Sequence, residues 1–267
     1  MTALTISHLT HRYGKTLALN DLSLTLPRGL TVGLIGPDGV GKSTLLALIA
    51  GVRRIQSGEL HVLGGDMRKP ADRQALSHRI AYMPQGLGRN LYPTLSVYEN
   101  IDFHARLFGL PARERRARIA RLLEATGLAP FPDRATGKLS GGMKQRCAIA
   151  QAFAIDPPIL LMDEPFGALD AVTRAKLQDL VLELWESGEK SRKKTVFFVT
   201  HDVDEAILLA DHIIVLGQRP SRIIYELRIP EEKRAKRETQ FVDPEIISMR
   251  NELIRQINQD VEQHIGE

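Results

Sequence analysis

The hydrophobic and polar positions in the first third of the chain repeat mainly with a period of two. Leu22, Leu24 and Leu26 alternate with polar residues, as they do in a strand that buries one face. Alternating or continuously apolar runs predict strands over residues 3–8, 18–26, 30–35, 59–63 and 80–83. A helix is predicted over residues 43–50, directly after a glycine-rich stretch. The chain therefore begins with strands and a strand–loop–helix unit.

The remaining part of the chain changes to helical spacing and then to a regular alternation. Residues 97–126 predict a mainly helical subdomain inserted into the sheet domain, and another helix should begin near Gly141. Beyond it, strands are predicted over 159–162, 195–199 and 213–216, and helices over 172–186 and 203–210. This alternation is typical of an α/β fold with a largely parallel sheet, whose central strands are apolar throughout.

The tail is predicted to form an amphipathic helix. Asp243 is a suitable N-cap and Pro244 suits the first helical position. One apolar stripe is formed by Ile246, Met249, Leu253, Ile257 and Val261. We expect the stripe to pack on the body of the protein, with a partner-binding or dimerising role as the alternative. The predicted organisation is an α/β domain over residues 1–230, with the helical subdomain at about 86–155, followed by a linker and helix over 231–267.

The strand over residues 30–35 leads into a complete phosphate-binding pattern. It reads Gly36-Pro37-Asp38-Gly39-Val40-Gly41-Lys42-Ser43 and is called the P-loop below. Its glycines let successive N–H groups point at phosphate oxygens, and the helix N-terminus adds partial positive charge. Lys42 is predicted to reach the β- and γ-phosphates, the Ser43 hydroxyl to coordinate Mg²⁺, and Thr44 to complete the nucleotide-binding set. The flanking strand and helix argue against a chance glycine-rich turn.

Two carboxylates follow the apolar run over residues 159–162. Asp163 and Glu164 therefore come at the carboxyl end of a buried strand, the end that faces the ligand crevice in an open parallel sheet. Asp163 is predicted to hold Mg²⁺ and Glu164 to deprotonate the attacking water. The alternative is that the pair caps a helix, but the presence of a P-loop favours the catalytic interpretation.

A second glycine turn opens the helix expected near Gly141. Ser140, Gly141 and Gly142 precede that helix and offer another set of free N–H donors for phosphate. One ATP does not need two such sites from one chain. We therefore expect two chains arranged head to tail, with each ATP between the P-loop of one chain and this turn of the other.

With these motifs in place, residues 1–220 resemble the ATP-binding cassette (ABC) family. Leu139–Arg146, LSGGMKQR, resembles its signature motif. The resemblance implies a P-loop NTPase fold with a mostly parallel central sheet, an antiparallel β subdomain and an inserted helical subdomain. It also implies an active ATPase that uses ATP and Mg²⁺, with Ser140, Gly141 and Gly142 contacting the γ-phosphate held by the partner chain.

Four further positions match motifs of the same family. Tyr13 resembles the aromatic residue that stacks on adenine, and Gln85 resembles the glutamine that senses Mg²⁺ and the attacking water. Asp170, in Gly-Ala-Leu-Asp, resembles the loop that communicates across the dimer, and His201 resembles the switch histidine that contacts the γ-phosphate. Tyr13, Gln85 and His201 are weak signals alone, but the order and spacing of these positions around the three stronger motifs make the joint match specific.

Composition places the chain among ordinary globular proteins. Of its 267 residues 43% are hydrophobic and 25% charged, and the single cysteine, Cys147, fits a reducing compartment. No apolar stretch is long enough to span a bilayer, and the start lacks the features of a secretory signal. We expect a cytoplasmic protein, peripheral on the inner face of the cell membrane.

The net charge of +4 is partly local, because basic residues gather in two segments, Arg113–Arg121 and Lys233–Arg237. We interpret both as solvated surfaces, with anionic lipid contact as the alternative. No nucleic-acid partner is expected, because neither segment has interleaved aromatic residues for base stacking.

Three function classes remain to be compared. A kinase or GTPase would leave Leu139–Arg146 unexplained. A soluble cassette ATPase of the chromosome type would separate the P-loop from the signature by a long coiled coil, whereas here about a hundred residues intervene. We therefore favour the ATPase subunit of an ABC transporter. The implied partners are a second ATP-binding subunit, transmembrane permease subunits and a substrate-binding protein.

The direction of transport receives two different signals. Residues 90–100 and 108–109 resemble cassettes of ABC-2 or multidrug exporters. Residues 162–170, 198–206 and 218–223 resemble importers of nitrate, sulfonate or taurine. We favour import, with export as the alternative. A third hypothesis is a mosaic of the two lineages joined at the shared signature motif, which would be rejected if both halves had the same nearest relatives.

Overall fold

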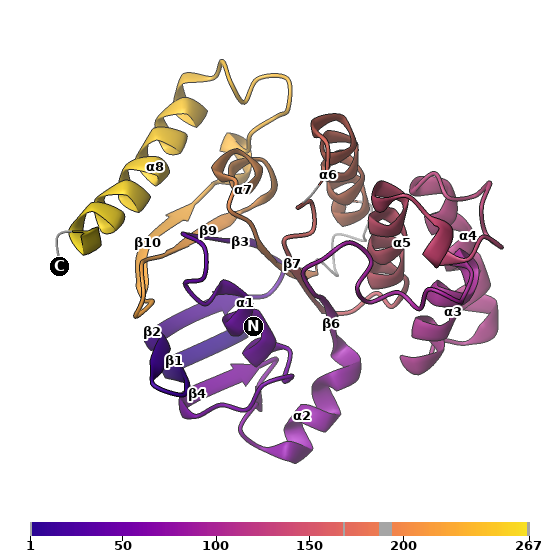
Figure 1. Cartoon of the computed structure of the whole chain (residues 1–267), viewed down its shortest axis with the longest axis horizontal. Helices are drawn as coiled ribbons and strands as arrows, with labels where there is room; N and C mark the ends of the chain where they lie inside the picture. Colours follow the sequence, from indigo (N-terminus) through magenta and orange to yellow (C-terminus); the bar gives the residue numbers. More distant parts are fainter. Residues whose placement is uncertain (1, 168, 187–193, 266–267) are drawn as a thin grey trace. The chain divides into compact units, whose positions relative to one another are not determined.

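A computed structural model describes residues 2–167, 169–186 and 194–265 of the chain. The chain forms two compact units, coloured by sequence in Figure 1. The first unit comprises the described residues of Met1–Ser77 and Lys193–Glu267, and the second comprises those of His78–Arg192. Among the described residues, every helix is too short or too polar to cross a membrane.

The first unit contains an antiparallel sheet with strand order β2-β1-β4-β5. Its strands are β1 (Thr2–Tyr13), β2 (Thr16–Pro27), β4 (Ser57–Val62) and β5 (Gly65–Asp66). Leu22, Leu24 and Leu26 are buried while the polar residues between them are exposed, so the period of two places one face of β2 in the core. The early strands predicted from the sequence are confirmed, although β1 and β2 are longer than expected.

Parallel strands of the same unit carry the P-loop. These are β3 (Thr31–Ile35), β8 (Thr195–Val199) and β9 (His212–Leu216), and β3 pairs in parallel with both β8 and β9. Strand β10 (Ile223–Arg228), which the sequence analysis missed, pairs antiparallel with β9. Every residue of β3 is buried, and α7 (Val203–Leu209) packs on it. Gly33 permits this approach, because a Cβ at that position would lie 3.3 Å from the Cβ of Ala210.

Shorter helices and the tail helix complete the first unit. They are α1 (Lys42–Ile49), α2 (Pro70–Leu76), α8 (Pro244–Ile265) and a 3-10 helix at Glu231–Lys233, while a further 3-10 helix, Ser77–Arg79, spans the boundary between the two units in the sequence. Helix α8 runs beside α7 and β10 (Figure 1) and begins as predicted, with Asp243 accepting from the Glu245 N–H at 2.9 Å. Ile246 and Leu253 are buried, so the apolar stripe packs on the body. An ion pair between Arg250 and Asp204, at 2.8 Å, also joins α8 to α7.

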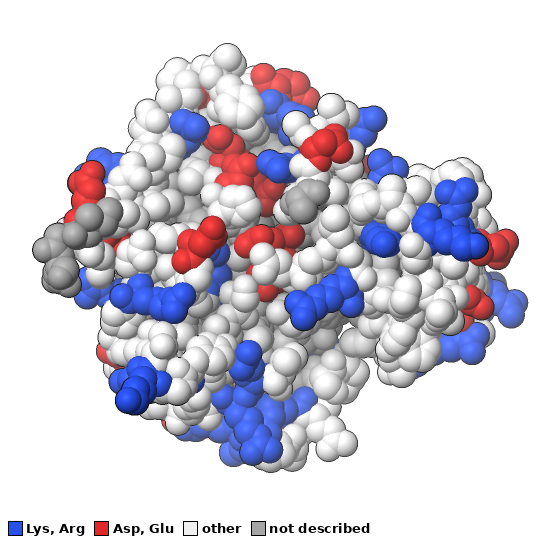
Figure 2. Space-filling model, in the orientation of Figure 1, with Lys and Arg blue, Asp and Glu red and all other residues white. Residues whose placement is uncertain are grey.

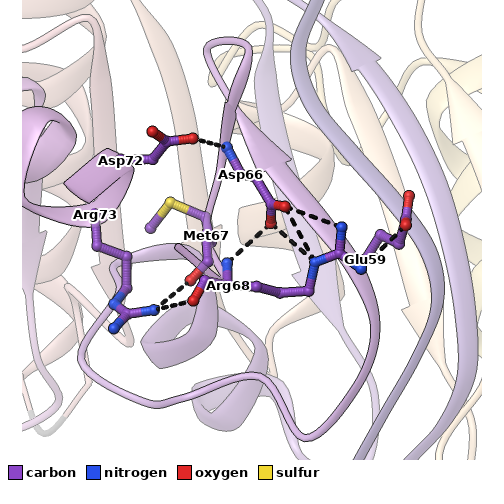
Figure 3. Close-up of polar contacts among 6 residues, drawn as sticks. All are labelled: Glu59, Asp66, Met67, Arg68, Asp72 and Arg73. Carbon is purple, nitrogen blue, oxygen red and sulfur yellow. Dashed lines mark hydrogen bonds and ion pairs between the residues drawn. The ribbon is translucent and has the colours of Figure 1, made fainter. Parts of the chain in front are cut away.

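An ion-paired cluster fixes the turn between β5 and α2 (Figure 3). Asp66 accepts hydrogen bonds from both the backbone and the guanidinium of Arg68, and Arg68 also reaches Glu59 at 3.0 Å. Asp72 accepts from the Asp66 N–H at 2.8 Å. The Arg68 hydrogen bonds lower the pKa of Asp66 from 3.8 to about 2. These contacts give a loop with few apolar residues a defined shape.

The second unit combines one parallel strand pair with helices. Its elements are β6 (Ile80–Met83), α3 (Val97–Leu107), α4 (Ala112–Ala125), a 3-10 helix at Thr136–Lys138, α5 (Gly141–Ala154), β7 (Ile159–Asp163) and α6 (Ala171–Glu186). Strands β6 and β7 pair in parallel, with Met83 opposite Met162. Helices α3, α4 and α5 pack on one another within the range expected for the helical subdomain. The predicted boundaries of that subdomain stay a prediction.

Local capping explains where α3 begins. Ser96 accepts from the Glu99 N–H at 3.1 Å, and Glu99 accepts in return from the Ser96 N–H at 2.7 Å. The fully buried Asn100 side chain accepts from the Tyr92 N–H and donates to three carbonyl oxygens, including that of Leu95. Asn100 therefore fixes the loop that leads into the helix.

The first basic segment is less solvated than the sequence analysis expected. Arg115 pairs with Asp102 at 2.7 Å with only 14% of its side chain exposed, and Arg118 pairs with Glu114 at 2.6 Å. Figure 2 shows Lys and Arg in separate patches on the face drawn, rather than in one continuous surface. Two arginines of this segment are therefore ion-paired, while Arg113, Arg116 and Arg121 are exposed as the sequence analysis expected.

Candidate active site

The P-loop connects β3 to α1 in the first unit, as its sequence pattern predicts. Gly36, Gly39 and Gly41 have φ values of +145°, +72° and +105°, a region that side chains with a Cβ rarely adopt. The apolar strand before the loop is held between β8 and β9, so the loop starts from a fixed position at the carboxyl end of β3. Glycine suits these positions because it adopts a positive φ without the steric penalty that a Cβ would cause.

The start of α1 fits an anionic ligand. Gly41 is its N-cap and has no side chain to accept a hydrogen bond from the first helical turn. Lys42 is 5% exposed, and its Nζ donates to the carbonyl oxygens of Gly36 and Pro37, both at 2.7 Å. The ammonium group is thereby held inside the loop. Ser43 is exposed beside it. The N–H groups at the start of α1 and the loop lysine are the donor types that bind phosphate.

Tyr13 lies next to this loop in the same unit. Its hydroxyl is 3.0 Å from the Thr44 hydroxyl, so β1 and α1 are linked at the predicted nucleotide site. The Arg53 guanidinium lies 4.8 Å from the centroid of the Tyr13 ring, and the His11 ring makes an edge contact with it. Burial is the main cause of a lowered pKa for His11, with a smaller contribution from Arg53. The sequence analysis missed Arg53, for which no motif provides a signal.

His201 follows β8 in the first unit and is exposed. The next residue, Asp202, caps α7 by accepting from the Asp204 and Glu205 N–H groups at 2.9 and 3.1 Å. The cap ends the strand-to-helix turn and holds the backbone around His201. The predicted switch histidine is thus placed on a fixed turn at the carboxyl end of a buried parallel strand.

The second unit brings Gln85 and Glu164 together. Because Met83 pairs with Met162 in parallel strands, the residues two positions further along each strand leave the sheet at the same edge. Gln85 Nε2 donates to Glu164 Oε2 at 2.8 Å. Glu164 has a φ of +49°, an uncommon value for a residue with a side chain. Asp163, at the end of β7, is 2% exposed.

The signature segment begins α5 in the same unit. Ser140 is the N-cap and accepts from the Met143 N–H at 3.4 Å. Gly142 lies close to α6, because a Cβ there would meet Thr173 Cγ2 at 3.0 Å. The buried Gln145 side chain donates to the carbonyl oxygen of Pro165. This contact, which the motif alone did not predict, ties the signature helix to the loop that follows Glu164.

Asp170 lies at the start of α6, and Cys147 is a buried thiol within α5. Asp170 accepts from the Thr173 N–H at 2.9 Å at the start of α6, and that hydrogen bond lowers its pKa. Ala168, part of the predicted Gly-Ala-Leu-Asp motif, lies outside the described residues. Burial raises the pKa of Cys147 to about 12, so the thiol is unreactive at neutral pH.

The predicted site residues thus fall into two groups, each described within its own unit. Tyr13, Gly36–Thr44 and His201 belong to the first unit. The second contains Gln85, Ser140, Gly141, Gly142, Asp163, Glu164 and Asp170. Direct contacts join Tyr13 to Thr44 and Gln85 to Glu164.

Comparisons with known proteins give a consistent result. A family model described as ABC transporter matches residues 19–167. The taurine import ATP-binding protein TauB of Jannaschia sp. (strain CCS1) is 40% identical over 236 residues, which cover 86% of this chain and 83% of that protein. The protein of the same name from Pseudomonas aeruginosa PAO1 is 37% identical over 230 residues, with the same coverage of both chains.

Two solved structures share the fold. The structure of cbiO1 from Clostridium perfringens, part of the ABC transporter complex cbiONQ, is 29% identical, has a TM-score of 0.74 and covers 92% of this chain and 97% of its own. A dimeric ATP-binding cassette in a post-hydrolysis state with ADP and phosphate is 29% identical, has a TM-score of 0.72 and covers 84% and 98%. These likenesses confirm the P-loop NTPase fold class expected from the sequence.

Proposed function

Because the chain belongs to the ABC transporter family, we propose that it is the ATP-hydrolysing subunit of an importer for taurine or a chemically similar sulfonate, or for nitrate. The observation that carries the proposal is the identity of about 40% to taurine import ATP-binding proteins over most of both chains. The ATPase activity follows from the family, and the P-loop at the N-terminus of α1 supports it.

Each predicted site residue receives a role in ATP hydrolysis. The P-loop and Thr44 hold the phosphates, Lys42 neutralises their charge, and Tyr13 stacks on the adenine. Glu164 removes a proton from the attacking water, which Gln85 orients, and His201 contacts the γ-phosphate.

Mg²⁺ fits the oxygen ligands that Ser43, Gln85 and Asp163 offer. When bound, it neutralises charge that develops on the phosphates. These assignments rest on the residue types, their order in the chain and the contact between Gln85 and Glu164.

The proposed assembly contains a second ATP-binding subunit. Ser140, Gly141 and Gly142 of one chain contact the γ-phosphate bound by the other, and Asp170 lies in the loop that communicates between them. The turn before α5 offers phosphate a second set of N–H donors besides the P-loop, and one ATP does not need both from one chain, which favours a site that two chains complete. Permease subunits carry the substrate across the membrane, a substrate-binding protein delivers it, and this subunit binds at the inner face.

Uptake in the native cell tests the proposal. Deletion of the encoding gene should abolish uptake of radiolabelled taurine or of nitrate, and the wild-type gene should restore it. Lys42→Ala should fail to restore uptake, whereas the matched control Lys69→Ala, at an exposed position outside the predicted site, should restore it fully. Unchanged uptake after deletion would refute import of these substrates.

Export is the alternative function, and the same deletion strain distinguishes it from import. Residues 90–100 resemble exporter cassettes, so an exporter ATPase would leave uptake intact and make the deleted strain retain a multidrug substrate. The import relatives match over one stretch of the chain that includes both halves. The mosaic hypothesis requires each half to be ranked separately against relatives, and it stays a hypothesis.

A further inference from the structure

The segment after β9, residues 217–222, lies directly against the P-loop; we call this segment the strap. A Cβ on Gly39 would lie 2.6 Å from Arg219 Nη2, so the Arg219 guanidinium covers the tip of the loop. A Cβ on Gly36 would clash with the carbonyl oxygen of Leu216, the residue that precedes the strap. The Ser221 hydroxyl donates to the carbonyl oxygen of Val40 in the loop itself.

The contacts just described between the strap and the loop do not involve its phosphate-binding N–H groups. They are made by the Ser221 hydroxyl to the carbonyl oxygen of Val40 and by the Arg219 guanidinium beside Gly39. None of them uses a backbone N–H of the P-loop, and the N–H groups are what bind phosphate. The strap therefore supports the loop without using the groups that would bind phosphate.

Ser221 is the fixed point of the strap. It is fully buried, and its hydroxyl also lies 3.0 Å from the carbonyl oxygen of Gly217. Its backbone N–H donates to the Ala18 carbonyl oxygen, and its own carbonyl accepts from the Asn20 N–H at 2.9 Å. Strand β2 thus holds Ser221 at the place where its hydroxyl meets the P-loop.

The tail helix holds the other end of the strap. Asp260 of α8 is 6% exposed, and its Oδ2 accepts from the Gln218 N–H at 2.5 Å. Its Oδ1 approaches Gly217 so closely that a Cβ there would lie 2.7 Å from it. A bond between a buried carboxylate and a backbone N–H is charge-assisted and stronger than a neutral one. Asp260 therefore fixes the strap from α8.

We propose that Asp260 and Ser221 are positioning residues for nucleotide binding. Asp260 on the tail helix and Ser221, held by β2, fix the strap, and the strap in turn fixes the P-loop. The inference rests on the proposed function. A loop with glycines at positive φ has many conformations, and ordering it when the ligand arrives opposes binding. Contacts that hold the loop in its binding conformation before the ligand arrives reduce the entropy cost of ordering it. The tail helix thus tunes the affinity for ATP without touching the nucleotide.

The test measures binding of a fluorescent ATP analogue, and steady-state hydrolysis, with the purified full-length chain. Asp260→Ala should raise the Kd about tenfold, equivalent to about 1.4 kcal/mol, and raise KM with little change in kcat. Asp260→Asn keeps an acceptor oxygen and should restore most of the affinity. Ser221→Ala should also weaken binding, and the double variant should be no weaker than the worse single variant, since both act through one strap.

Matched controls separate this role from general loosening of the tail. Arg250→Ala breaks another contact of α8 with the body but leaves the strap untouched, and Ser248→Ala changes an exposed serine of α8. Both should bind the analogue as tightly as wild type. Equal weakening in Arg250→Ala would overturn the proposal, as would unchanged affinity in a folded Asp260→Ala.

If Asp260→Ala fails to fold, Ser221→Ala decides, because it leaves α8 intact; unchanged affinity there overturns the inference. A wild-type chain that binds no ATP would overturn the proposed function, and this inference with it. Normal wild-type binding with unaffected strap variants would overturn the inference alone.

Discussion

Replacing Glu164 by glutamine separates the chemistry of this residue from its contacts. Glu164 accepts from Gln85 Nε2 at 2.8 Å. Glutamine has nearly the same size and retains an acceptor oxygen for Gln85, while the negative charge and the basicity are lost. Glu164→Gln should therefore keep ATP binding and the local structure but stop hydrolysis, so that an ATP-bound dimer accumulates.

The expected magnitude distinguishes a base from a residue that only positions Gln85. General-base catalysis contributes about 10²–10⁴-fold, which is roughly 2.7–5.4 kcal/mol of activation free energy. Loss of one hydrogen bond to a charged group costs about 1.5–3 kcal/mol, or roughly 10- to 150-fold. Glu164→Gln retains an acceptor for that bond, so a loss of more than about a hundredfold in kcat would have to come from the missing base.

Phosphate release under saturating ATP measures kcat, and binding of a fluorescent ATP analogue measures affinity. Light scattering with and without ATP reports the dimer. Gln85→Ala is the companion variant, since it removes the same hydrogen bond from the other side and leaves the carboxylate in place. Normal turnover in Glu164→Gln would refute Glu164 as the base. A larger loss in Gln85→Ala than in Glu164→Gln would show that orientation dominates.

Further predictions concern the P-loop and the two local networks. Lys42→Ala should weaken ATP binding by about tenfold or more, measured by equilibrium dialysis, while Lys69→Ala should leave it unchanged. Asp66 has a folded pKa of about 2, lowered by Arg68 from 3.8, so its stabilisation is complete above about pH 4 and is lost as the pH falls toward 2. Urea unfolding of wild type and Asp66→Asn should therefore differ at pH 6 and converge near pH 2; a constant difference would contradict the assigned pKa. Asn100→Ala leaves several buried backbone groups without partners and should lower the free energy of unfolding by about 2–4 kcal/mol in the same assay, and a loss below about 0.5 kcal/mol would contradict its role.

The strands and helices that the sequence predicted were those with strong periodicity. Continuous apolar runs became buried parallel strands, and Asp243 and Gly141 marked helix starts as expected. The elements that were missed, β5, α2 and β10, are short or lack a continuous apolar run. Whether such segments form a strand or a helix depends on what they pack against in the folded protein, because their apolar residues show neither the helical nor the strand periodicity clearly.

The order of residues in the chain is enough to predict the chemistry of this protein. A P-loop after an apolar strand, carboxylates at the end of another and a Ser-Gly-Gly turn are local patterns, because each needs only a few neighbouring residues to place its groups. Tertiary structure decided which distant residues support them. Arg53 over Tyr13, Gln145 on Pro165 and Asp260 on the strap join positions far apart in the chain. Such contacts depend on how strands and helices pack, and no local spacing encodes that.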